Sequence, residues 1–185
     1  MVRSVKVYTE KTNQLKNMPK MNVQMKKRLH EVPMDMQVLQ KLRIIIQTAH
    51  KHSAVIKKKT GISGAQLWLL QEIAEEDGVK VGDAARRMSL KSTTVSNLVE
   101  SLIELNLIQR FKDKADQRVV RLSLTSKGKI LIKKAPKPTR GFLPDSLKLL
   151  SKKELIDLNK SLDHLLEQIS QLDSKLAMEP LPFTV

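Results

Sequence analysis

A change in hydrophobic spacing between residues 61 and 135 constrains the fold more than any other feature of this sequence. In three stretches within residues 63–105, apolar side chains recur every three or four positions, which is the period of a helix that buries one face. Within residues 107–124 they alternate over short runs, which is the period of strands. Three helices followed by a hairpin predict a mainly α fold, a winged helix-turn-helix whose wing is the small β-hairpin.

Capping residues locate the predicted elements. Ser63 is placed to cap the first helix, Gly78 to end it, and Asn106 to close a third helix over about 92–105. The polar segment 112–117 separates two predicted strands and forms the hairpin tip. The remaining expectations are a short helix after Gly82, a tight turn at 89–91, strands at 107–111 and 118–124, and a helix over 126–135 capped by Thr125.

Two further helices flank this unit. After the break made by Pro136, Pro138 and Pro144, Ser151 and Glu154 have the spacing of a capping box. The predicted organisation is a basic, partly ordered extension (1–33), a dimerisation helix (34–60), the winged helix-turn-helix (61–135), a Pro-containing linker (136–150), a C-terminal dimerisation helix (151–177) and a tail (178–185).

The flanking helices carry aliphatic residues at helical spacing. A winged-helix core of about 75 residues can bury its own helices, so these extra apolar stripes predict an interface. They can pack on each other within one chain or on a second copy, and the two arrangements are compatible. The predicted dimerisation residues are Leu39, Leu42, Ile46, Leu155, Leu158, Leu162, Leu165, Ile169, Leu172 and Leu176.

The net charge of +15 comes from two basic blocks: residues 1–60 contain 14 basic and 3 acidic side chains, and residues 80–134 contain 13 and 5. Such basic blocks favour binding to polyanions, although a contribution to solubility alone would also explain the positive charge. The absence of cysteine excludes disulfides and thiol catalysis. No apolar run has membrane-spanning length, and the first residues lack a secretory signal, so we expect a soluble, cytoplasmic, nucleoid-associated protein.

One motif points to a family. Residues 116–128 read D-Q-R-V-V-R-L-S-L-T-S-K-G, which resembles the D-x-R-x-x-x-L-x-L-T-x-x-G wing signature of the MarR (multiple antibiotic resistance regulator) family. Residues 62–66 and 94–96 also resemble that family, and the likeness extends over roughly 35–177. It implies a homodimeric transcriptional repressor on duplex DNA that responds to a small aromatic or anionic effector, with no other cofactor. The Pro-rich break at 136–144 departs from the family's usual long fifth helix.

The third predicted helix is the candidate recognition helix. Its N-terminal face has the short polar side chains Ser92, Thr93, Ser96 and Asn97, which can approach base edges in a major groove. Thr94 lies nearer the packed face, so it has either a phosphate contact or a packing role. The alternative is a polar helix start with no ligand.

The hairpin tip is the candidate wing. Arg118 can enter a minor groove, and the resemblance implies that Asp116 holds this arginine in place, a role that is compatible with a turn-forming aspartate. Predicted phosphate contacts are Arg110, Lys112 and Lys114, with Arg86, Arg87 and Lys91 as weaker ones that solvent exposure also explains.

The sequence alone leaves three alternative functions open. An architectural DNA-binding protein of low specificity would use the basic N-terminal block, and a winged-helix interaction module would bind protein instead of DNA. An enzyme has the least support, because no catalytic set stands at a suggestive spacing. No metal site is expected, since His50 and His52 are two residues apart and face different sides of their helix. Trp68 belongs either to the core or to a pocket.

Overall fold

The computed structural model describes residues 32–113 and 115–185, which form two compact units divided after Ile44. The described part of the first unit, residues 32–44, contains the beginning of helix α3 (Met34–Thr60), and the rest of that helix belongs to the second unit. Lys114 and most of the basic extension lie outside the described residues. Within the described ranges no helix is long and apolar enough to span a bilayer.

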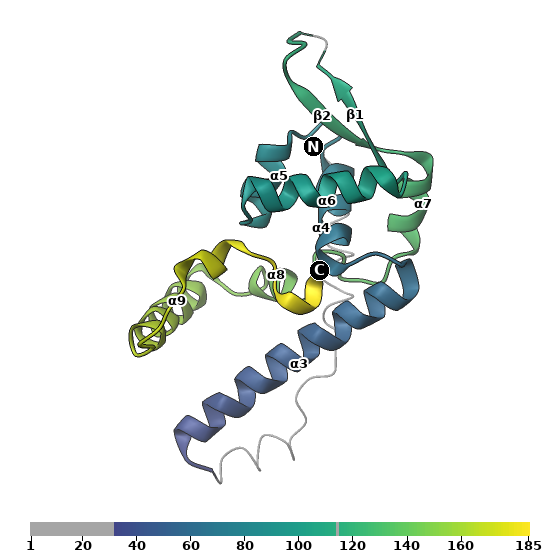
Figure 1. Ribbon diagram of the computed structural model, residues 1–185. Coiled ribbons are helices and arrows are strands. Elements are labelled where there is room, and N and C mark those ends of the chain that lie inside the picture. The colour runs from purple at the N-terminus through teal and green to yellow at the C-terminus, as the bar shows by residue number, and fades with distance from the viewer. Residues whose placement is uncertain (1–31, 114) are drawn as a thin grey trace. The chain divides into compact units, whose positions relative to one another are not determined.

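The second unit contains the predicted winged helix-turn-helix, in which three helices precede a two-stranded antiparallel hairpin. Figure 1 shows the hairpin extending beyond α6. The elements of this head are α4 (Gly64–Glu75), α5 (Val81–Met88), α6 (Ser92–Glu104), β1 (Ile108–Lys112), β2 (Val120–Leu124) and α7 (Ser126–Lys134). The mainly α fold class is confirmed.

Two of the predicted caps are present at α4 and α6, but Gly78 does not end α4, because that helix stops at Glu75 and the extended residue Glu76 is its C-cap. Ser63 and Gln66 form a reciprocal capping box at the start of α4, with backbone-to-side-chain distances of 2.8 and 3.2 Å. Asn106 adopts the left-handed conformation, with φ of 54°, just after α6. These two local signals mark the start of α4 and the end of α6.

The core of the head lies where α4 and α6 cross beneath the hairpin. Apolar side chains from all these elements are almost completely buried, which removes their surface from water and stabilises the unit. The most buried members are Leu67, Leu69, Leu70, Val79, Val95, Val99, Leu102 and Leu122.

The hairpin is fastened to the helices at its base. Ile108 pairs with Leu124 and Lys112 with Val120, which sets the register of the two strands. Leu122 also exchanges backbone hydrogen bonds with the loop after α4, accepting from the Gly78 N–H (2.9 Å) and donating to the Val79 carbonyl (3.1 Å). The wing is therefore anchored at one end and projects from the head at the other.

Gly128 marks a backbone contact between α7 and the start of β1. A Cβ at this position would lie 2.1 Å from the Leu107 carbonyl oxygen, which cannot move without displacing the hairpin. We expect Gly128→Ala to lower the free energy of unfolding by about 1–3 kcal/mol or more, as overpacking does. Urea unfolding followed by circular dichroism measures this change.

Gly82 provides the matched control. A Cβ there meets nothing within 4 Å, and the residue lies in the first turn of α5 with no positive φ. Gly82→Ala should therefore leave the protein unchanged or stabilise it by about 0.4–1 kcal/mol. Equal destabilisation by both substitutions would contradict the proposed clash.

The C-terminal region differs from the sequence prediction. The linker contains a short helix, α8 (Phe142–Leu147), and the C-terminal helix α9 (Lys152–Glu167) ends ten residues before the predicted residue 177. Two 3-10 helices follow α9: η1 (Ser174–Met178), within the region predicted to be helix, and η2 (Pro182–Thr184), within the predicted tail.

Local hydrogen bonding explains the early end of α9. The N–H groups of Gln168 and Ile169 bond three residues back instead of four, which tightens the last turn. Asp173 then adopts an extended backbone, and its side chain accepts from the Lys175 N–H (3.0 Å) to start η1. Ile169, Leu172 and Leu176 are consequently outside the helix on which they were predicted to lie.

Candidate nucleic-acid interface

Helix α6 has one packed and one accessible face. Val95, Leu98 and Val99 are buried against the head. Ser92, Thr93 and Asn97 are exposed, and Ser96 is half-buried with its hydroxyl donating to the Ser92 carbonyl (2.8 Å). The predicted base-reading residues thus lie on one accessible face, and they are small enough for the helix backbone to approach a groove.

The start of α6 is occupied by the end of the chain. Thr94 donates its hydroxyl hydrogen to Glu179 Oε2 (3.1 Å), and Lys91 Nζ is 2.7 Å from Glu179 Oε1. Both bonds lower the pKa of the Glu179 carboxyl, and the bond from Lys91 has the larger effect. Thr94 therefore has an anionic partner, although this partner comes from the protein itself.

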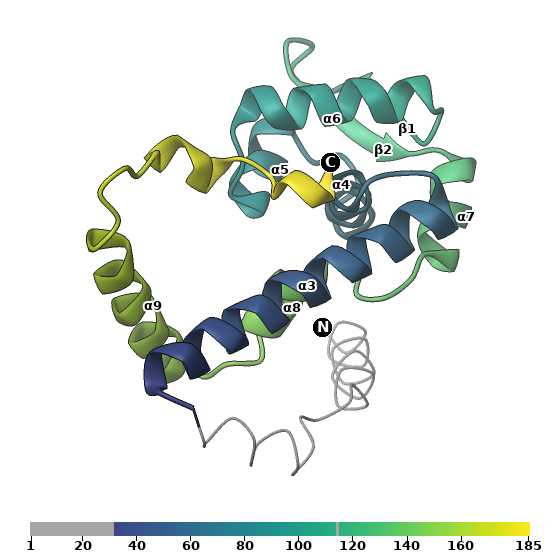
Figure 2. The ribbon, with the colours of Figure 1, turned by 60° about the horizontal axis from the view of Figure 1, so that its bottom comes forward.

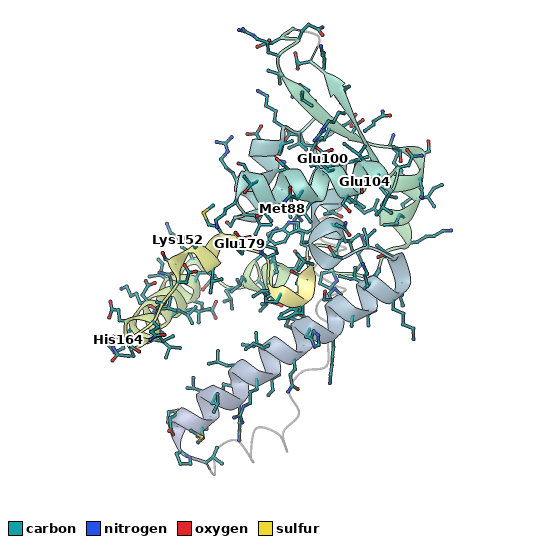
Figure 3. All side chains as sticks on the ribbon, viewed as in Figure 1. Met88, Glu100, Glu104, Lys152, His164 and Glu179 are labelled. Carbon is teal, nitrogen blue, oxygen red and sulfur yellow. The ribbon has the colours of Figure 1, made fainter. Side chains whose placement is uncertain are left out.

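The basic side chains around α6 are paired with carboxylates. Arg86 bonds Asp83 and Arg87 bonds Glu76. Arg110, on β1, reaches Glu100 of α6 with two nitrogens, at 2.5 and 3.2 Å (Glu100 is labelled in Figure 3). A phosphate contact from Arg86, Arg87 or Arg110 would require one of these exposed pairs to exchange its partner, which costs little for surface ion pairs.

The tip of the wing holds Asp116 and Arg118 together. Asp116 Oδ1 accepts from the backbone N–H of Arg118 at 3.0 Å and from its Nε at 3.3 Å. The Arg118 side chain is nevertheless 91% exposed, so its guanidinium projects from the tip with one edge held by the carboxylate. Lys112 is also exposed on β1. The pairing that the resemblance implied is therefore formed.

A second arginine, Arg121, was not identified from the sequence. Its Nη1 donates to the Gly78 carbonyl (2.9 Å), and its Nε donates to Asp113 at the tip of the wing. Asp113 also accepts from the N–H groups of Ala115 and Asp116, and all three bonds lower its pKa, with that from Arg121 having the largest effect. The Arg121–Asp113 pair braces the wing against the loop after α4. The sequence contains no signal for the role of Arg121, because its backbone partner Gly78 is 43 residues away along the chain.

A cavity of about 210 Å³ lies below the helix-turn-helix, between the second-unit part of α3, α4, the linker and the C-terminal tail. Its walls are mostly apolar and include Trp68 of α4, Phe142 of α8 and Phe183 of the tail, with His52 and Arg140 as polar groups. Trp68 therefore lines a pocket as well as packing on the core.

A buried ion pair supports one side of the cavity. Glu72, only 3% exposed, accepts from Trp68 Nε1 and from Arg140 Nε, each at 2.8 Å, and Arg140 also bonds Glu75. Burial disfavours the charge on Arg140, but the bonds to Glu72 and Glu75 outweigh burial and raise its pKa. The arginine is therefore cationic and fixed in place.

Removing Glu72 should destabilise this region. Glu72→Leu removes the acceptor of the Trp68 N–H and of Arg140 Nε and leaves Arg140 only its bond to Glu75, so we expect a loss of about 1–3 kcal/mol in the free energy of unfolding. Glu72→Gln retains an acceptor oxygen and should lose less. Urea unfolding followed by the fluorescence of Trp68, the one tryptophan, measures both. Wild-type stability in the leucine variant would contradict a structural role for this pair.

The fold and the exposed helix-and-wing surface define a winged-helix protein, and comparison with known proteins narrows the class. Residues 60–119 match the model of the MarR family. The HTH-type transcriptional repressor MdtR of Bacillus subtilis (strain 168) is 27% identical over 138 residues, which cover 75% of this chain and 88% of MdtR. YsmB of the same organism, an uncharacterized HTH-type transcriptional regulator, is 28% identical over 125 residues, covering 63% and 86% of the two chains.

A solved structure shares the fold. The crystal structure of a MepR-like protein complexed with pseudoligands has a TM-score of 0.50 and 23% identity, and the match covers 72% of this chain and 94% of that one. The chain is therefore similar to the MarR family over residues 60–119 and to two HTH-type transcriptional regulators over 63–75% of its length. Members of this family are regulators and not enzymes, which agrees with the sequence expectation.

Proposed function

We propose that this protein is a sequence-specific repressor that binds a pseudo-palindromic duplex site as a homodimer. In each copy α6 would enter a major groove, and the wing would place Arg118 in the adjacent minor groove. The observation that carries the proposal is the Asp116–Arg118 pair, which holds a 91% exposed guanidinium at the tip of the wing, in the same head that exposes the polar face of α6. Repression as the direction of control follows the name of the relative MdtR.

The exposed leucines of α9 support the homodimer. Leu155, Leu158, Leu162 and Leu165 are each between 38% and 44% exposed along one stripe of this helix. Soluble proteins rarely leave such a stripe in water, because covering it with another apolar surface is favourable. A second copy would cover it and would bring two reading heads to half-sites about 34–36 Å apart.

The cavity supports a ligand-responsive regulator. Its aromatic and aliphatic walls suit a small aromatic molecule, and His52 offers a polar group for an anionic substituent. Such a ligand would act by favouring a dimer whose heads are wrongly spaced for the operator. Titrating the DNA complex with benzoate and with neutral aromatic compounds tests this response, and unchanged affinity with every compound would contradict it.

Selection of bound sequences from random duplexes tests the main proposal. A specific dimer should enrich a two-fold symmetric motif and prefer it by about a thousandfold or more over random duplex. An architectural protein would show nearly equal affinity for all duplexes, and an interaction module would retain none. Either of these results would replace the proposed function.

A further inference from the structure

The C-terminal tail returns to the helix that is proposed to read DNA. At the end of η1, the Met178 carbonyl accepts from the backbone N–H of Lys91 at 3.1 Å. The next residue, Glu179, places one carboxylate oxygen on Lys91 Nζ and the other on the Thr94 hydroxyl. Figure 2 shows the yellow C-terminal segment passing close to α5, and Figure 3 labels Glu179 near Met88 at the end of that helix.

The end of the tail has a separate anchor on α3 and α4. Ser53 donates its hydroxyl hydrogen to the Phe183 carbonyl (2.6 Å), and the Phe183 ring packs edge-on against His50, with centroids 5.3 Å apart. A Cβ on Gly64, the first residue of α4, would lie 3.6 Å from Thr184 Cβ, so the tail is in close contact there. The segment from Met178 to Thr184 therefore bridges the cavity between two attachment points.

The donors that the tail occupies are those that a phosphate would use. A recognition helix receives the DNA backbone at its start, where N–H groups, a hydroxyl and a lysine converge. Here the Lys91 N–H, the Lys91 ammonium and the Thr94 hydroxyl all donate to oxygens of the tail, and the Glu179 carboxylate supplies the negative charge. The Lys91 backbone N–H and the Thr94 hydroxyl have one hydrogen each, so a phosphate that bonds to them would have to displace the Met178 carbonyl and the Glu179 carboxylate.

We propose that the C-terminal tail is an intramolecular competitor of DNA, in which Glu179 occupies a phosphate position at the start of α6 and must leave before the operator is bound. This inference rests on the proposed DNA-binding function. Because the same tail lines the cavity through Leu181 and Phe183, occupation of the cavity and release of the tail are linked.

Two variants of the full-length protein test the competition. Glu179→Gln removes the charge, and Phe183→Ala weakens the distant anchor without a change in charge. Each should bind the selected duplex about two- to fivefold more tightly than the wild type, the range expected for exposed ion pairs and their attachment. Fluorescence anisotropy of labelled DNA measures these affinities.

Glu167→Gln is the matched control. It makes the same change in charge at the exposed end of α9. The ion pair described for Glu167 is with His164, and not with Lys91 or Thr94. A nonspecific gain in attraction to DNA would appear equally in this variant. If Glu179→Gln gains no more than Glu167→Gln, or binds more weakly than the wild type, the competition is overturned.

Trp68 gives an independent reading of tail release. It shares the cavity with Leu181 and Phe183, and it is the one tryptophan of the chain. Adding the duplex to the wild type should increase quenching of its fluorescence by acrylamide, whereas unchanged quenching would show that the tail stays docked on DNA. If no variant binds any duplex, the proposed function fails together with the inference. Binding without differences between variants removes only the inference.

Discussion

Arg118→Ala should weaken binding to the selected duplex by at least about 30-fold. A groove-inserted arginine contributes about 1–3 kcal/mol, and a symmetric dimer uses two of them. The side chain is 91% exposed in the protein alone, so its removal disturbs no packing. The free energy of unfolding should therefore be unchanged while the affinity measured by fluorescence anisotropy falls.

Two further variants separate charge from geometry at the wing. Arg118→Lys keeps the charge but cannot form the same planar contacts, so it should recover only part of the affinity. Asp116→Asn weakens the pair at the tip and should cost less than losing the arginine itself. If Arg118→Ala binds as tightly as the wild type, the wing does not contact DNA, and the interaction-module alternative gains support.

Leu162→Asp should raise the dissociation constant of the dimer by more than about a thousandfold. Leu162 lies within the exposed apolar stripe of α9, so in the dimer it would be buried against the partner. An unpaired carboxylate in an apolar interface costs several kcal/mol, and the two-fold axis repeats the cost. Analytical ultracentrifugation across protein concentrations measures this change, and affinity for the palindromic duplex should fall with it.

Lys160→Asp is the control for this substitution. It introduces the same side chain two residues earlier, nearly opposite on the helix because successive residues are about 100° apart. This variant should remain dimeric. Equal behaviour of the two variants, or a wild type that is monomeric at all concentrations, would refute the proposed interface.

The head of the molecule was predictable because its signals are local. Ser63, Asn106 and Thr125 define helix ends through bonds to residues at most three positions away, or through their own backbone preference. The pairing of Asp116 with Arg118 also spans two residues. Short-range patterns of this kind are set by the sequence itself and survive in the folded protein.

The C-terminal third was predicted less well for the opposite reason. The regular leucine spacing up to Leu176 favoured one long helix, yet apolar spacing does not reveal where backbone hydrogen bonding changes to another pattern. The contact between Glu179 and Lys91 joins residues 88 positions apart, and that between Arg140 and Glu72 joins residues 68 apart. Pairings at such separations depend on the tertiary fold and leave no periodic trace.

The anchored linker determines where the molecule can bend. The Pro138 carbonyl is 2.9 Å from His52 Nε2, Thr139 donates to Gln71 at 2.9 Å, and Arg140 is held by Glu72. The proline-containing segment up to Arg140 is therefore fixed to the head and is not a flexible linker. We therefore expect rotation of α9 relative to the head to arise beyond Arg140, where Gly141 adopts a φ of 93° that suits a residue without a side chain.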